Sequence, residues 1–149
     1  MYKHIMLPLD GSGELSSRAV QEGVALAGML GSKITLLTVV PSYHTGITTP
    51  LTSDLVHEVE ASRDVEHRKV AEKLHAEITA HALAGKVKCE SLVVIGGKPY
   101  EQIIENALAR GCDLIVMATH GRKGLDALLV GSETVNVLTH SKLPVLVVR

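Results

Sequence analysis

Short runs of aliphatic residues alternate along this chain with segments of helical periodicity. The five runs are His4–Leu9, Ile34–Val40, Val87–Ile95, Asp113–Met117 and Leu143–Val148. Runs of this length without polar alternation are typical of strands buried on both faces. Strands that alternate with helices form parallel sheets through right-handed βαβ crossovers. The pattern predicts an α/β fold of the Rossmann-like type: an open five-stranded parallel sheet with helices on both faces.

The segments between these runs predict four helices. They are expected over Glu14–Leu30, Asp54–Ala84, Pro99 to about Gly111, and from Ser132 onward, with Ser12 and Ser132 as caps. Pro41–Ser53 is rich in Pro, Gly, Ser and Thr and is expected to be a loop. No internal repeat or change of composition divides the chain, so residues 1–149 are expected to form one domain.

The second predicted helix is unusually long. Val70, Leu74 and Ile78 form a candidate core stripe in its second half, whereas its first half is mostly polar and is expected in solvent. Its histidines lack an i,i+4 pair, so a solvated face is expected rather than a metal site; they are His57, His67, His75 and His81.

The charged start of the third strand, with Lys86, Lys88 and Glu90, favours a position at the edge of the sheet. The strand order 3-2-1-4-5 is therefore favoured over 2-1-3-4-5, which the residues alone leave open. Ligands of doubly wound sheets bind beyond the carboxyl ends of the strands, where the order reverses. The turn with Asp10 would then face the loop His120–Lys123 across a crevice between strands one and four.

The stretch from Ala118 to Ser132 joins a buried strand to a helix start through glycine-bearing residues. Free backbone N–H groups and the positive end of the helix dipole make such a loop an anion site. It has neither the GxxxxGK[ST] nor the GxGxxG spacing. Opposite it, the Asp10 carboxylate can accept hydrogen bonds from ribose hydroxyls or a base, and Val39 and Val40 can form an apolar wall.

The spacing Ala118-x2-Gly121-x9-Gly131-Ser132 resembles the G-x2-G-x9-G-[ST] signature of nucleotide-binding universal stress proteins, with Ala118 in place of the first glycine. The similarity extends from Ile5–Ser12 to Pro144–Val148. It implies the order 3-2-1-4-5, bound ATP (or AMP or ADP) with Mg²⁺ or Mn²⁺ bridging the phosphates, and a homodimer through the last strand. No metal ligand from the protein is expected.

The resemblance also assigns residues to parts of the nucleotide. It implies base and ribose contacts for Pro8, Leu9, Asp10 and Val39. For the two halves of the phosphate loop it implies Met117, Ala118, His120 and Gly121, then Gly131, Ser132, Glu133 and Thr134. Arg122 and Lys123, beside this loop, are further candidates for phosphate contact. The methyl group of Ala118 is expected to reduce the space for the ribose, because the family's backbone lies against the ribose at this position.

Composition excludes several classes of partner. The net charge is −1 and aromatic residues make up 2% of the chain, so neither a basic field nor a base-stacking platform for nucleic acid exists. No apolar run has membrane-spanning length, and the first residues do not resemble a signal peptide. Cys89 and Cys112 lack CxxC spacing and are expected to be buried, reduced thiols, which favours the cytoplasm.

The favoured function is an ATP-binding regulatory protein of the stress response that acts as a homodimer. The last strand ends the chain without a covering helix, so Leu143–Val148 would form an unprotected sheet edge unless a second copy pairs with it. A slow ATP hydrolase is one alternative, although no Walker lysine or acidic cluster is present and no catalytic residue is assigned. A nucleotide-free dimeric interaction module is the other, and Ala118 keeps it open.

Overall fold

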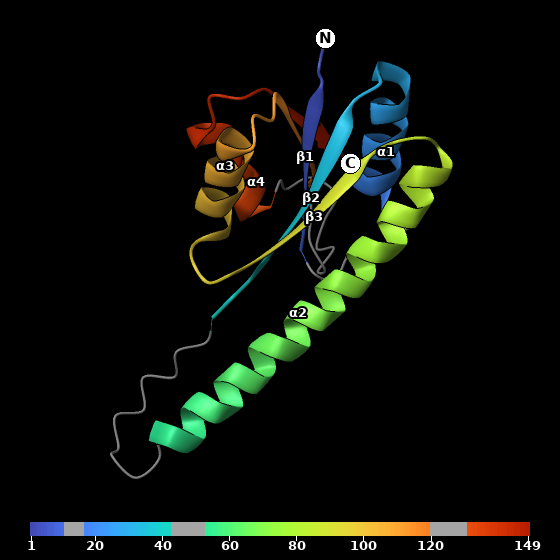
Figure 1. The fold of residues 1–149 in the computed structure, drawn as a ribbon. Helices are drawn as coiled ribbons and strands as arrows, with labels where there is room; N and C mark the ends of the chain where they lie inside the picture. Colours follow the sequence, from blue (N-terminus) through green and yellow to red (C-terminus); the bar gives the residue numbers. More distant parts are fainter. Residues whose placement is uncertain (11–16, 43–52, 120–130) are drawn as a thin grey trace.

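The computed structural model describes residues 1–10, 17–42, 53–119 and 131–149 (Figure 1). Five strands form one parallel sheet in the order β3-β2-β1-β4-β5. The strands are β1 (His4–Leu9), β2 (Lys33–Val40), β3 (Cys89–Ile95), β4 (Leu114–Ala118) and β5 (Val145–Val148). The helices are α1 (Arg18–Leu30), α2 (Ser53–Ala84), α3 (Pro99–Ala109) and α4 (Ser132–His140). The predicted sheet and strand order are confirmed, with β3 at one edge.

Helices cover both faces of the sheet, as predicted. α1 and the second half of α2 lie on one face, and α3 and α4 lie on the other (Figure 1). Successive side chains of a strand point to opposite faces. In β1, Leu7 therefore packs under α1 and α2, whereas Met6 packs under α3 and α4. Each fully buried aliphatic side chain contributes about 1.5–3 kcal/mol, so both layers hold the central strands in place.

Several boundaries differ from the sequence prediction. α1 begins at Arg18 rather than Glu14, because Ser17 has an extended ψ of 130°; the predicted cap Ser12 lies outside the described residues. β3 begins at Cys89 because the Val87 N–H bonds back to the carbonyl oxygen of Ala82 in the turn that ends α2, 2.9 Å away. β5 begins only at Val145. The residue before it is a proline, which has no N–H to donate to a ladder.

α2 runs past the carboxyl end of the sheet, so its first half projects away from the strands (Figure 1). The described side chains of that half are mostly exposed, as predicted. The predicted core stripe is correct for Leu74 and Ile78 but wrong for Val70, whose exposed fraction is 50%. The next residue, Ala71, is the first buried residue among the described side chains of α2. Helical spacing identified the buried side of α2 but not the point at which the helix leaves the sheet.

His75 also differs from the prediction, because it lies in the core with an exposed fraction of 1%. Its Nε2 lies 2.8 Å from the hydroxyl oxygen of Thr38 in β2, and its Nδ1 lies 2.6 Å from the hydroxyl oxygen of Ser91 in β3. Burial lowers the pKa of His75 to about 4, so the ring is neutral at pH 7. The other three histidines of α2 are exposed, as predicted.

Candidate functional site

The strand order reverses at β1. Its two neighbours are β2, which follows it in the chain, and β4, with Pro8 opposite Leu37 and Met6 opposite Ile115. The crossovers therefore leave β1 in opposite directions, and in open α/β sheets ligands bind at such a point, beyond the carboxyl ends of the strands. Asp10 follows β1 directly and is exposed at this edge.

The first turn of α4 is fastened to the carboxyl end of β4. The Gly131 N–H donates to the carbonyl oxygen of Thr119 at 2.6 Å. The Thr134 hydroxyl donates to the carbonyl oxygen of Ala118 at 2.9 Å, and only 4% of Thr134 is exposed. The first N–H groups of an α-helix have no acceptor within the helix and carry the positive end of its dipole. The N–H groups of Ser132, Glu133 and Thr134 therefore form an anion-attracting surface at the carboxyl end of β4.

Gly131 has a packing reason for being glycine. A Cβ atom there would lie 3.1 Å from the carbonyl oxygen of Thr119, closer than backbone and side chain normally approach. Its φ of −58° is open to any residue, so close approach rather than backbone freedom favours glycine here. Gly131 is the N-cap of α4 and Ser132 is the first helical residue, so the expected capping by Ser132 is wrong. The Ser132 side chain is exposed instead.

Glu133 turns its carboxylate toward α3. Its Oε2 accepts a hydrogen bond from the Tyr100 N–H at 2.9 Å, in the first turn of α3. The negative charge therefore lies at the positive end of α3. The carboxylate of Glu133 is therefore directed away from the amino-terminal end of α4, whereas its backbone N–H stays at that end.

The other predicted site residues fall into two groups. Leu9 and Met117 are buried, on opposite faces of the sheet, so only their backbone atoms are available to a ligand. Pro8, Val39 and Ala118 are half-buried near the carboxyl ends of β1, β2 and β4. The predicted phosphate-loop residues His120, Gly121, Arg122 and Lys123 lie outside the described residues.

Comparison with known proteins identifies the family of this chain. The model of the universal stress protein family matches residues 1–149. The chain belongs to the universal stress protein family. A universal stress protein of Thermus aquaticus is 33% identical over 152 residues, covering 100% of both chains. Universal stress protein MJ0531 of Methanocaldococcus jannaschii is 31% identical over 150 residues, covering 100% of this chain and 83% of its own length.

Solved structures of universal stress proteins share the fold. MJ0577 of Methanocaldococcus jannaschii superposes with a TM-score of 0.81 at 30% identity, covering 99% of this chain and 96% of its own. An Archaeoglobus fulgidus member solved in complex with dAMP has a TM-score of 0.69 at 17% identity, covering 99% and 98%. A further member, in complex with cAMP, has a TM-score of 0.63 at 23% identity, covering 99% and 97%.

Two residues of this universal stress protein's candidate site were missed from sequence. Thr119 is buried, and it links β5 to α4: its N–H donates to the Val148 carbonyl at 2.9 Å, and its carbonyl accepts from Gly131. Its position directly after a buried strand could have indicated this role. Tyr100 supplies the N–H that Glu133 binds. The preceding Pro99 was the available signal, because a proline at the helix start makes the next N–H the first free donor.

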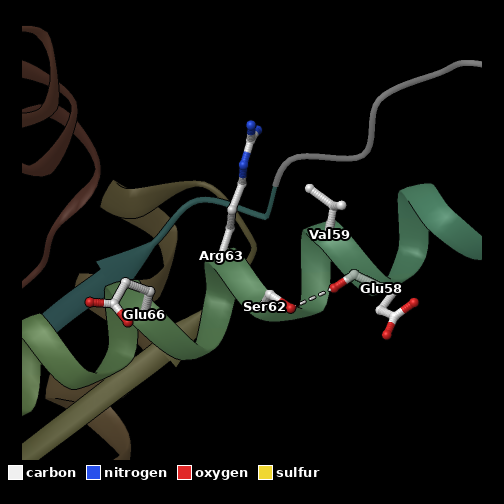
Figure 2. Close-up of a pocket in the computed structure, with 5 residues that line it drawn as sticks. All are labelled: Glu58, Val59, Ser62, Arg63 and Glu66. Atoms are coloured by element: carbon white, nitrogen blue, oxygen red, sulfur yellow. Dashed lines mark hydrogen bonds between the residues drawn. The ribbon is translucent and has the colours of Figure 1, made fainter.

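A separate surface depression lies on the projecting half of α2. It is lined by Glu58, Val59, Ser62, Arg63 and Glu66, all from that one helix. Figure 2 shows these side chains pointing in different directions from the helix, with the Ser62 hydroxyl donating to the Glu58 carbonyl at 2.8 Å. The depression includes none of the predicted site residues, and solvent surrounds its side chains.

Within the described part of the chain, no group of three or more His, Cys, Asp and Glu residues could hold a metal ion. None of the helices there is long and apolar enough to span a bilayer.

Proposed function

We propose that this universal stress protein is a regulatory protein that binds an adenine nucleotide, foremost ATP, between β1 and β4. The supporting observation is the pair of hydrogen bonds that hold the first turn of α4 at the end of β4, from Gly131 and Thr134. β4 lies next to β1, where the strand order reverses. A helix N-terminus held at this edge suits a phosphate group. The ligands of two relatives with the same fold, dAMP and cAMP, are both adenine nucleotides.

In this proposal each part of the nucleotide has a partner. The Asp10 carboxylate accepts hydrogen bonds from ribose hydroxyls, and Val39 covers one face of the adenine, with backbone contacts from Pro8 and Leu9. The N–H groups of Ser132 to Thr134 hold the β- and γ-phosphates. The remaining loop residues of the proposed site are Met117, Ala118, His120, Gly121, Arg122 and Gly131.

The proposed divalent cation is carried by the nucleotide. Mg²⁺ binds through one or two carboxylates and substrate phosphates and keeps several waters, rather than requiring an all-protein cage. The described part of the chain offers no cluster of three or more ligating side chains. Phosphate oxygens and water are therefore the proposed ligands of Mg²⁺ or Mn²⁺, which would neutralise the triphosphate.

The regulatory unit is proposed to be a homodimer joined through the last strand. β5 pairs with β4 on one side only, and Leu146 on it is 41% exposed. Val135 and Leu138 of α4 are also exposed. An unprotected apolar edge is prone to uncontrolled strand pairing, and pairing with a second copy removes that risk.

Binding of the nucleotide would shift the equilibrium between monomer and dimer, or the binding of a partner, because the nucleotide binds one state more tightly than the other. Reduced Cys89 and Cys112 fit the cytoplasm.

Isothermal titration calorimetry with Mg-ATP tests the nucleotide site through the exposed Ser132. Ser132→Asp places a negative charge at the helix start, which stabilises a helix by about 0.3–1 kcal/mol but repels phosphate. We expect ATP binding to be lost in Ser132→Asp without a lower melting temperature, and to persist within about threefold in the control Ser132→Ala. ATP binding by Ser132→Asp equal to that of wild type contradicts the site. No binding heat from wild type at any temperature favours the nucleotide-free dimeric module instead.

A further inference from the structure

The amino-terminal turns of α3 and α4 meet at Glu133. α3 starts with Pro99, which has no N–H, so the Tyr100 N–H is the first backbone donor of that helix. Glu133 Oε2 accepts this hydrogen at 2.9 Å. The two helices pack together on the same face of the sheet, with Ile103 of α3 and Val137 of α4 in one core cluster. One hydrogen bond from a charged side chain thus connects the two helix starts.

A single stripe of α4 faces α3. Glu133, Val137 and His140 recur at i, i+4 and i+7 and so lie on one side of the helix. Tyr100 contacts both ends of this stripe: its N–H binds Glu133, and its ring centroid lies 5.2 Å from that of His140. On another side, Thr134 bonds to the end of β4. The rotation of α4 about its own axis is therefore fixed from two directions.

The hydrogen bond to Tyr100 also determines where the negative charge of Glu133 lies. A carboxylate in the first turn of α4 would compete with a phosphate for the positive end of that helix. Its hydrogen bond to Tyr100 places this charge at the start of α3 instead. The N–H groups at the start of α4 then stay available to a ligand.

We propose that Glu133 is a positioning residue: through the Tyr100 N–H it aims the first turn of α4 at the terminal phosphates and makes the site prefer ATP over AMP. The inference rests on the proposed function, because it assigns the role of one side chain within that site. The role differs from direct phosphate contact, since the carboxylate acts through α3.

Three substitutions of Glu133 distinguish the effect of its side-chain length on ATP binding from the effect of its charge. Glu133→Gln keeps the acceptor at the same distance and removes the charge. Glu133→Asp keeps the charge but is one methylene shorter, and Glu133→Ala removes both. Calorimetry with Mg-ATP and with AMP should show ATP binding within about twofold of wild type for Gln and about tenfold weaker for Asp and Ala. AMP binding should change less than about twofold in all three. Glu105→Ala, on the exposed side of α3, is the control and should change neither ligand.

Two results would overturn the inference. One is an ATP affinity that depends on the charge at position 133, so that Glu133→Asp binds ATP like wild type and Glu133→Gln binds it as weakly as Glu133→Ala. The other is an equal weakening of AMP and ATP, which is expected from a general loss of structure.

Hydrogen exchange tests the positioning without nucleotide. Exchange of the Tyr100 and Val135 amides should speed up about tenfold or more in Ala and Asp, and stay near wild type in Gln. If wild type binds no ATP, the proposed function fails, whereas exchange still decides whether Glu133 fixes α4. Unchanged exchange in Glu133→Ala overturns the positioning role in either case.

Discussion

The hydroxyl of Thr134 donates a 2.9 Å hydrogen bond to the carbonyl oxygen of Ala118, joining the first turn of α4 to the last residue of β4. Residues 119–131 separate the ends of these two elements in the chain, and 120–130 lie outside the described residues. The bond is therefore a direct link between the strand end and the helix start that the proposed phosphate site requires.

Thr134→Val should test this link with little change in side-chain shape. The buried hydroxyl is lost, so the free energy of unfolding in urea should fall by about 1–2 kcal/mol. ATP affinity should fall as well, because the first turn of α4 loses one attachment. Thr139→Val is the matched control: its hydroxyl bonds to the Val135 carbonyl on the exposed side of the same helix. A similar loss of stability in both variants would speak against a special role for the Thr134 bond.

Ala118→Gly should tighten nucleotide binding. Ala118 is half-buried at the end of β4, at the position where the family signature has glycine and the backbone is proposed to lie against the ribose. Removing the methyl group should strengthen Mg-ATP binding roughly threefold in calorimetry. It should also cost about 0.5–1 kcal/mol of stability, because glycine loses more backbone entropy on folding.

The control for this prediction is Ala25→Gly, at an exposed position of α1. It should cost similar stability and leave the affinity unchanged. Unaltered or weaker ATP binding by Ala118→Gly would mean that the methyl group does not narrow the site.

Stability should fall as the pH drops from about 6.5 to about 4. Burial lowers the pKa of His75 from 6.5 to about 4, so in this window the unfolded chain binds a proton that the folded protein does not. Above the unfolded pKa both states are neutral and His75 adds no pH dependence. By pH 4 the loss should approach about 3 kcal/mol. Burial foremost, then Lys33, lowers the pKa of His4, which acts in the same direction.

Urea unfolding at pH 7.0 and 5.0 tests the contribution of His75. In His75→Gln the unfolding free energy should depend less on pH than in wild type, although the variant is less stable at pH 7. The exposed His81→Gln should retain the wild-type dependence. Equal pH dependence in wild type and His75→Gln would refute this assignment.

Leu146→Lys should convert the proposed dimer into a monomer. Leu146 is 41% exposed on β5, at the edge of the sheet, and lysine at an edge strand prevents strand-to-strand pairing. Sedimentation equilibrium should report a dimer for wild type and a monomer for the variant, with unchanged circular dichroism. Leu108→Lys on α3, where the leucine is 53% exposed, should stay dimeric. A dimer in both variants would place the interface elsewhere.

Much of the fold was predictable because it depends on local patterns. Aliphatic runs such as Ile34–Val40 identify buried strands, and the charges around Lys88 and Glu90 identify the edge strand. What failed depended on contacts between distant segments. His75 was expected in solvent, but hydroxyl groups of β2 and β3 make a polar core position available to it.

The candidate site was predictable in part for the same reason. The spacing from Ala118 to Gly131 and Ser132 indicated a strand, a loop and a helix start, and the structure places α4 at that start. The hydrogen bond between Glu133 and Tyr100 was not predictable, because it depends on how α3 packs beside α4. The close approach of Gly131 to the Thr119 carbonyl likewise needed coordinates.

The central claim is that adenine nucleotide binds between the end of β1 and the first turn of α4. Nuclear magnetic resonance of the ¹⁵N-labelled protein during a titration with Mg-ATP tests this most directly. We predict that the amide signals of Asp10, Ser132, Glu133 and Thr134 shift together and saturate with one binding constant. AMP should shift Asp10 but leave the α4 amides nearly unchanged. Shifts confined to the exposed half of α2, or no shifts with saturating ATP, would contradict the account.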